Sequence, residues 1–311
     1  MGTHALLANP DHRLAFTGSY YCPLVRDKVY FFQKYLNGVT INYMFSLTLL
    51  KPKEFKKMIL IENCRLSDIP VLHLVKESYK NEKLPLVFFI HGYTSAKEHN
   101  LHYGYLLAEA GFRVVLPDAL YHGEREVKMS EDELNFKFWD IVTNEIEELE
   151  VLKNELITRG IIDPERIGLV GTSMGGITTL GAMTQYSWIK AAVSLMGSPY
   201  CVKFLQGQLA ELKRLGLSIP LTDEQLNSQF DKLRKYDLSL QPQKLDERPL
   251  LFWHGELDEV VPFHYTYEFY NQVKTKYKDK SRINFIVDHN ADHKVSREGL
   301  LATVEWFKKH L

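Results

Sequence analysis

The sequence predicts an α/β fold in which a mostly parallel sheet carries helices on both faces. From Met58 onward, apolar runs of strand length alternate with segments of helical periodicity. The run Leu86–Ile90 is apolar without interruption, as a strand buried on both faces should be. With 311 residues, 45% of them hydrophobic and 25% charged, the chain has enough apolar material for one large core and lacks the composition of a disordered protein.

The first half of this region is expected to contain four strands and two helices. The strands are the stretches 58–61, 69–75, 86–90 and 112–116. The first two form an antiparallel pair around a polar turn at 65–68. One helix is expected at about 100–110. A longer helix starts at a capping box formed by Ser130 and Glu133, and its apolar residues keep helical spacing up to Gly160.

The second half continues the alternation. Strands are expected at 166–170, 191–195, 250–253 and 283–287, and helices at 174–186, around 265–274 and from 296 to the end. Alternation over this length implies parallel strands joined by crossover helices. The region 58–311 holds 311 − 57 = 254 residues, which is normal for one α/β domain.

Two segments lie outside the alternation. Residues 1–57 contain scattered prolines and aromatic residues without a sustained helical or strand period. We expect them to be an N-terminal extension that is poorly ordered or not part of the core, or an artefact of start-site choice.

Residues 200–245 contain leucines at helical spacing and a capping box at Thr222 and Gln225. This segment predicts either a small helical cap over the C-terminal edge of the sheet or surface helices packed against the fold.

Charge and cysteine content narrow the class of protein. Lys and Arg total 38 against 39 Asp and Glu, so no overall field favours nucleic acid or an anionic membrane. The three cysteines lie far apart and form neither a disulfide-rich nor a metal-binding pattern, which fits a reducing compartment. The apolar stretches are too short to span a bilayer, and the N-terminus lacks a signal-peptide pattern. We therefore expect a soluble cytoplasmic protein without membrane or nucleic-acid partners.

The candidate nucleophile is Ser173, in the pattern Gly171-Thr172-Ser173-Met174-Gly175. An apolar strand precedes this G-x-S-x-G pattern and a helix follows it, which is the setting of a nucleophile elbow in the α/β-hydrolase fold. Small residues let the sharp turn form, and the positive end of the helix lies next to the serine. The alternative is a tight strand-to-helix turn whose serine only caps the helix.

A nucleophilic serine needs a base, and the base needs an orienting acid, in the chain order Ser, Asp or Glu, His. Asp258 follows a predicted strand, at the sheet edge where ligand-facing groups gather, and Glu256 and Glu259 are the alternatives. His293 is the candidate base, because the loop before it has the reach to fold back over the sheet edge. His289 lies almost at the strand end, where we expect a structural role.

Hydrolysis of an ester also needs hydrogen-bond donors for the developing oxyanion. One candidate is the backbone N–H of Met174, directly after the nucleophile, and the other is that of Tyr93, in the loop after the strand 86–90. His91 and His122 also lie in loops at strand ends. We expect both histidines to hold these loops in place rather than to take part in catalysis.

Seven motifs occur in order from Met58 onward: Leu66 to Pro70, His91 to Ser95, Pro117-Asp118 with His122-Gly123, Gly171 to Gly176, Met196 to Ser198, His254 to Pro262, and His293. On these motifs the chain resembles bacterial α/β-hydrolase esterases of the branch shared by dienelactone hydrolases and prolyl-oligopeptidase-like enzymes. Two features depart from that pattern. Dienelactone hydrolases carry a cysteine where this chain has Ser173, and 57 N-terminal residues cannot build the propeller of an oligopeptidase.

The resemblance implies that Asp258 and His293 are the acid and base, with Tyr93 and Met174 as the oxyanion donors. It also implies hydrolysis of carboxylic esters through an acyl-enzyme, without a metal or organic cofactor. We expect a small-molecule ester as substrate. The alternatives are an acyl thioesterase, a small peptidase or amidase with the same triad, and a non-catalytic binding protein on a hydrolase scaffold.

Overall fold

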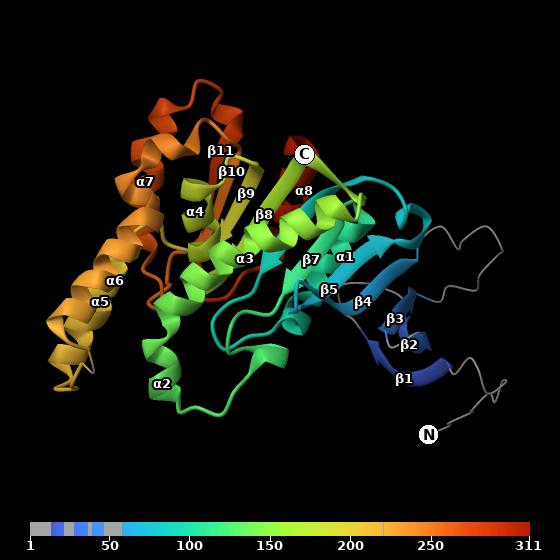
Figure 1. Ribbon diagram of the computed structural model, residues 1–311. Coiled ribbons are helices and arrows are strands. Elements are labelled where there is room, and N and C mark those ends of the chain that lie inside the picture. Colours follow the sequence, from blue (N-terminus) through green and yellow to red (C-terminus); the bar gives the residue numbers. More distant parts are fainter. Residues whose placement is uncertain (1–13, 22–27, 37–38, 47–57, 220) are drawn as a thin grey trace.

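A computed structural model describes residues 14–21, 28–36, 39–46, 58–219 and 221–311, the first three stretches as backbone only. Within these residues one sheet runs through the protein, and helices cover both of its faces (Figure 1). The sheet has 11 strands in the order β1-β2-β3-β4-β5-β7-β6-β8-β9-β10-β11.

The strands from Met58 onward form the predicted sheet. They are β4 (Ile59–Leu66), β5 (Ile69–Lys76), β6 (Leu84–Ile90), β7 (Arg113–Pro117), β8 (Ile162–Thr172), β9 (Ile189–Leu195), β10 (Leu250–Gly255) and β11 (Ile283–Asp288). All pairs among β6 to β11 are parallel, whereas β4 with β5 and β5 with β7 are antiparallel. The mostly parallel sheet is therefore confirmed. The predicted first turn is confirmed too, since Ser67 and Asp68 have φ values of 47° and 67°, as a tight hairpin turn requires.

Part of the N-terminal segment also forms strands, which the sequence does not predict. β1 (Leu14–Tyr21), β2 (Lys28–Leu36) and β3 (Val39–Ser46) pair antiparallel in succession, and β3 pairs with β4. Ladder hydrogen bonds join backbone groups, so they can form where side chains show no sustained alternation. The rest of residues 1–57 lies outside the described residues, and whether the segment can be dispensed with stays a prediction.

Helices cover the two faces of the sheet in two groups (Figure 1). One face carries α1 (Leu101–Glu109) and α8 (Arg297–His310), and the other carries α3 (Phe138–Thr158), α4 (Met174–Gln185) and α7 (Phe263–Val273). Each face buries its own apolar cluster. The first contains Leu107 and Phe307, and the second contains Ile146 and Leu180.

The long helix predicted to end at Gly160 is broken at Lys137 into α2 (Glu131–Phe136) and α3. The predicted capping box of Ser130 and Glu133 is present at the start of α2, none of whose residues is buried. Trp139, in the first turn of α3, is buried and donates from Nε1 to Gln208 at 2.8 Å. The break therefore separates an exposed short helix from one that packs on the sheet.

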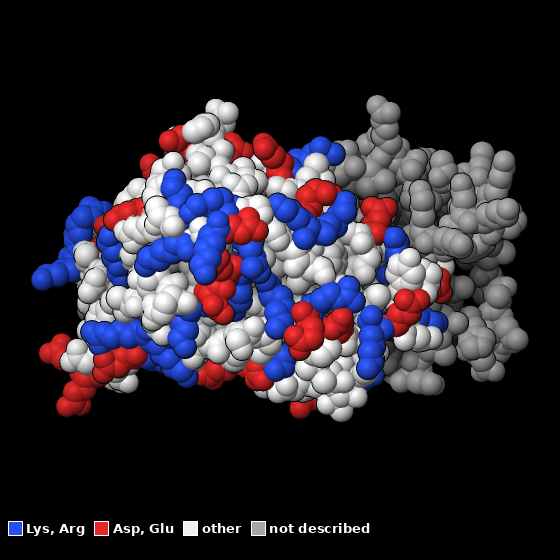
Figure 2. All heavy atoms as spheres, turned by 90° about the horizontal axis from the view of Figure 1, so that it is seen from above, with Lys and Arg blue, Asp and Glu red and all other residues white. Residues whose placement is uncertain are grey.

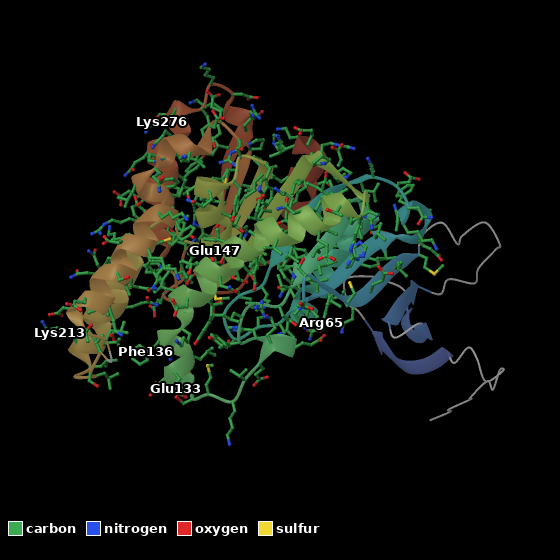
Figure 3. The ribbon with its side chains drawn as sticks, in the orientation of Figure 1. Arg65, Glu133, Phe136, Glu147, Lys213 and Lys276 are labelled. Atoms are coloured by element: carbon green, nitrogen blue, oxygen red, sulfur yellow. The ribbon has the colours of Figure 1, made fainter. Side chains whose placement is uncertain are left out.

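The segment predicted as a cap forms a hairpin of two helices, α5 (Cys201–Arg214) and α6 (Asp223–Tyr236). The predicted capping box at the start of α6 is present. At the base of the hairpin, where α6 packs against α3 and α4, Leu233 is fully buried. Leu215, beyond the end of α5, is 55% exposed instead. The far end of the hairpin projects away from the sheet, where Figure 3 labels Lys213.

Candidate active site

Ser173 lies in the turn between β8 and α4. Its φ of 53° and ψ of -114° form a backbone conformation that residues other than glycine rarely adopt, and such conformations concentrate at functional sites. Its side chain makes no capping hydrogen bond to α4, so this serine is not used as a cap. Instead its Oγ lies 2.7 Å from Nε2 of His293.

Glycine is required on both sides of this turn. A Cβ on Gly171 would lie 2.2 Å from the carbonyl oxygen of Gly175, and a Cβ on Gly175 would lie 2.2 Å from that of Ile90. Atoms do not approach this closely without bonding, so helix α4 can pack against β8 and β6 only with glycine at both positions. This close packing sets the start of α4, and with it Ser173, against the end of β6.

The structure brings Ser173, His293 and Asp258 into one chain of hydrogen bonds, as the sequence predicts. Nε2 of His293 lies 2.7 Å from Oγ of Ser173, and its Nδ1 lies 2.7 Å from Oδ2 of Asp258. Asp258 follows β10 and His293 follows β11, which are parallel neighbours in the sheet. Their loops meet at the carboxyl edge of the sheet, where α4 begins.

The alternative residues lie outside this chain of hydrogen bonds. Nδ1 of His289 lies 2.5 Å from Oε2 of Glu256, and both side chains are exposed. Glu259 is exposed as well. Asp258 is only 5% exposed, so it is the carboxylate of this loop that the fold encloses.

Asp258 is held as an anion although it is buried. Burial raises the pKa of its carboxyl group, but hydrogen bonds from His254, His293 and the N–H of Val261 together lower this pKa to well below its usual value. The N–H of Val260 also donates to Oδ1, at 2.9 Å. No role for His254 is predicted from the sequence, where it opens the motif His254 to Pro262 four residues before Asp258.

Both predicted oxyanion donors belong to segments beside Ser173. Met174 is the first residue of α4, where backbone N–H groups have no partner within the helix. Gly92 precedes Tyr93, and a Cβ on Gly92 would lie 3.5 Å from the Cβ of Ser173. The loop that carries the Tyr93 N–H therefore passes directly beside the nucleophile turn.

Two buried histidines fix the loop after β6. Nε2 of His91 accepts from the N–H of Ala119 at 3.0 Å, and its Nδ1 donates to the carbonyl of Gly92 at 2.8 Å. Nε2 of His122 accepts from the N–H of Thr94 at 3.0 Å. Burial lowers the pKa of His91 to about 4 and also lowers that of His122, so both rings are neutral at neutral pH. These contacts are those of residues that hold a loop, the role expected for both.

The described residues form neither a metal site nor a membrane-spanning helix. Among residues 58–219 and 221–311, no group of three or more His, Cys, Asp or Glu side chains could hold a metal ion. None of the helices described is both long and apolar enough to cross a membrane. On the face seen in Figure 2, acidic and basic side chains are interspersed.

Known proteins are similar to this chain in sequence and in fold. The model of the prolyl oligopeptidase family matches residues 102–311. The "Putative esterase YitV" of Bacillus subtilis (strain 168) is 56% identical over 255 residues, which cover 82% of this chain and 100% of that protein. "Esterase YjfP" of Escherichia coli (strain K12) is 32% identical over 258 residues, with the same coverage of 82% and 100%. The crystal structure of TT1662 from Thermus thermophilus has a TM-score of 0.63 at 20% identity and covers 81% of this chain and 97% of that one.

Proposed function

Because this chain belongs to the prolyl oligopeptidase family and is an esterase-like hydrolase, we propose that it cleaves small-molecule carboxylic esters, with Ser173 as nucleophile, His293 as base and Asp258 as orienting acid. The α/β-hydrolase fold and the resemblance to bacterial esterases are confirmed. One observation carries the proposal: the ring of His293 lies 2.7 Å from both Oγ of Ser173 and Oδ2 of Asp258.

In this proposal Asp258 selects the tautomer of His293. Its Oδ2 accepts the proton of Nδ1, so the lone pair of Nε2 faces the hydroxyl group of Ser173. His293 takes that proton as Oγ attacks the carbonyl carbon of the ester, and the charge of Asp258 stabilises the resulting imidazolium. The backbone N–H groups of Tyr93 and Met174 donate to the oxyanion.

The tetrahedral intermediate then collapses to an acyl-enzyme. His293 gives its proton to the oxygen of the leaving alcohol, and the carbon–oxygen bond to that alcohol breaks. A water molecule attacks the acyl carbonyl and gives a proton to His293, which returns it to Oγ of Ser173 as the acid is released. The ring of His293 therefore alternates between base and acid in each half of the reaction.

An ester as substrate is supported by the relatives and by the aromatic side chains near the nucleophile. Two relatives carry the word esterase in their names. The ring of Tyr93, whose backbone flanks Ser173, lies 5.6 Å from the ring of Phe138, which lies 6.3 Å from that of Phe204. Such a series of partly buried rings suits an apolar acyl or alcohol group.

A thioesterase acting on acyl-CoA is the second candidate. The basic residues of α5 that could bind the phosphates of coenzyme A are Lys203, Lys213 and Arg214. Arg214 donates to both carboxylate oxygens of Glu211, and Nζ of Lys203 lies 4.1 Å from the centroid of the Tyr265 ring. Lys213 lies towards the projecting end of the hairpin (Figure 3). Two of these three cations thus have partners within the protein, which favours the ester over an acyl-CoA.

Hydrolysis of a short-chain aryl ester by the whole protein tests the proposal. We expect Ser173→Ala to abolish turnover and labelling by a fluorophosphonate probe, whereas Ser187→Ala, an exposed serine after α4, leaves both unchanged. The same variants assayed on an acyl-CoA and on an aryl amide rank the thioesterase and amidase alternatives. Near-native ester hydrolysis by Ser173→Ala would exclude the mechanism, and failure of the probe to label the native chain would favour a non-catalytic binding protein.

We also propose that the protein resides in the cytoplasm. Cys64 and Cys201 are free cysteines, which fits a reducing compartment. Burial raises the pKa of the Cys64 thiol to about 11 and raises that of Cys201 as well, which keeps both thiols unreactive. Cys22 lies outside the described residues.

A further inference from the structure

A second histidine contacts the carboxylate of Asp258. His254 lies at the end of β10 and is fully buried. Its Nε2 lies 3.1 Å from Oδ2 of Asp258 and 2.8 Å from the carbonyl oxygen of Val261. The ring of Phe263 packs edge-on against the His254 ring, with centroids 5.8 Å apart. His254 is thus enclosed, and within the described residues its polar side-chain contact is with Asp258, the proposed orienting acid.

The partners of the His254 ring determine which nitrogen carries the proton. The carbonyl oxygen of Val261 can only accept a hydrogen bond, so Nε2 carries a proton and donates it. Nδ1 is buried and has no hydrogen-bond partner among the described residues. A second proton on Nδ1 would be a buried donor without an acceptor, which is unfavourable. The single N–H of His254 is therefore shared between the carbonyl oxygen of Val261 and Oδ2 of Asp258.

His254 and His293 donate to the same oxygen of Asp258. Oδ2 accepts from Nε2 of His254 and from Nδ1 of His293, while Oδ1 accepts from the N–H groups of Val260 and Val261. A carboxylate with four donors is a weaker hydrogen-bond acceptor for each of them than a carboxylate with three. The contact with His254 therefore weakens the attraction between Asp258 and a protonated His293.

We propose that His254 is a positioning residue that, by donating to Oδ2 of Asp258, sets how readily His293 takes the proton of Ser173. The catalytic consequence rests on the proposed function, whereas the hydrogen bonds themselves do not. Removing the His254 donor leaves more negative charge on Oδ2 for the imidazolium of His293, so His293 should titrate at higher pH. Since only neutral His293 can act as base, the acid limb of the rate profile should move to higher pH as well.

Other charged groups surround this site and stay the same in every variant compared. Glu256 and His289 pair with each other at the surface of the same two loops. Glu259 follows Asp258 directly, and Asp292 precedes His293. A shift between variants at residue 254 therefore reports the lost hydrogen bond rather than these neighbours.

Two substitutions separate the hydrogen bond from simple packing. His254→Leu removes the donor, whereas His254→Gln keeps an amide N–H at a similar reach. In kcat/KM against pH with an aryl ester, we expect the acid limb of His254→Leu to lie roughly 0.5–1 pH unit above that of the native chain, and that of His254→Gln close to the native one. Trp253→Phe, which alters the neighbouring buried residue of β10, should leave the limb in place.

A purely structural role would lower the amount of folded protein without moving the acid limb. An unshifted limb in folded, active His254→Leu would therefore overturn the proposal. An equal shift in Trp253→Phe would overturn it too, because that variant keeps the hydrogen bond to Asp258.

Nitrogen-15 NMR of histidine-labelled protein provides a second measurement, independent of turnover. In the Ser173→Ala background we expect His254 with a proton on Nε2 and a bare Nδ1, and His293 titrating at higher pH once His254 is replaced by Leu. A proton on Nδ1 of His254 would overturn the proposal even if the Leu variant does not fold. If ester hydrolysis persisted in Ser173→Ala, the proposed function would fail while the NMR result still decided the role of His254.

Discussion

Two buried carboxyl groups near helix α4 have opposite pKa shifts. Asp258 is 5% exposed and Glu145, on α3, is 4% exposed. The pKa of Asp258 lies well below its usual value, because hydrogen bonds outweigh the effect of burial. Burial raises the pKa of Glu145 to about 8, and the hydrogen bond from Thr178 offsets only part of that rise. At neutral pH the first is an anion and the second is mostly protonated.

The two pKa values shift in opposite directions because the two carboxyl groups have different numbers of hydrogen-bond donors, not because their burial differs. Asp258 accepts from two rings and two backbone N–H groups. Glu145 accepts from the hydroxyl group of Thr178 at 2.9 Å, and its Oε1 has no partner in the part of the chain that the structure describes. A loop can direct several N–H groups at one carboxylate, whereas a helix packed on another helix offers few side-chain donors. A buried carboxylate thus becomes an orienting anion where loops meet.

Replacing the carboxylate of Asp258 by an amide should have the largest effect, which is a loss of turnover. In Asp258→Asn the amide can donate to Nδ1 of His293, which favours the tautomer whose Nε2 cannot accept the Ser173 proton. We expect kcat to fall by about 10⁴-fold with KM nearly unchanged, as judged by steady-state kinetics on an aryl ester. Glu259→Gln, at an exposed carboxylate of the same loop, should leave kcat unchanged. Comparable activity in both variants would contradict the role given to Asp258.

Protonation of Glu145 should instead affect how the free energy of unfolding depends on pH. Because the folded chain keeps the Glu145 proton up to about pH 8 and the unfolded chain releases it near 4.5, the free energy of unfolding should fall as pH rises between these values. We expect Glu145→Gln to match the native chain near pH 5 and to exceed its stability by about 3–5 kcal/mol near pH 9. Urea denaturation at several pH values measures both curves. Parallel curves would mean that Glu145 is ionised in the folded state at neutral pH.

Removing the hydroxyl group that donates to Glu145 should change the free energy of unfolding less than Glu145→Gln does. Thr178→Val conserves the shape of a fully buried side chain but removes its hydroxyl group. We expect the free energy of unfolding to fall by about 1–2 kcal/mol, and the pKa of Glu145 to rise further because less now opposes burial. The same denaturation series detects this as a pH-dependent loss of stability that starts at the same pH but continues to higher pH before it levels off. An unchanged upper end of this pH range would show that Thr178 does not influence the carboxyl group.

The sequence indicates the candidate site more directly than it indicates these pKa shifts. The elbow around Ser173 and the turn at Ser67 and Asp68 depend on residues within a few positions, which a sequence displays directly. Each buried carboxyl group has a donor from a distant part of the chain, and His293 is 35 positions from Asp258. Thr178 is 33 positions from Glu145, and their meeting depends on how two helices pack. The break at Lys137 and strands β1 to β3 depend on tertiary contacts in the same way, so periodicity alone did not predict them.

Starting the chain at Met58 should have the smallest effect on ester hydrolysis and on the pH dependence of stability. Both carboxyl groups and all their donors lie between residues 145 and 293, far along the chain from β1 to β3. Truncation leaves β4 at the edge of the sheet, still paired with β5 on its other side. We therefore expect unchanged kcat/KM and an unchanged pH dependence of stability, as measured by the two assays above. An insoluble or inactive product would show that the N-terminal strands are integral, because the site itself loses none of its contacts.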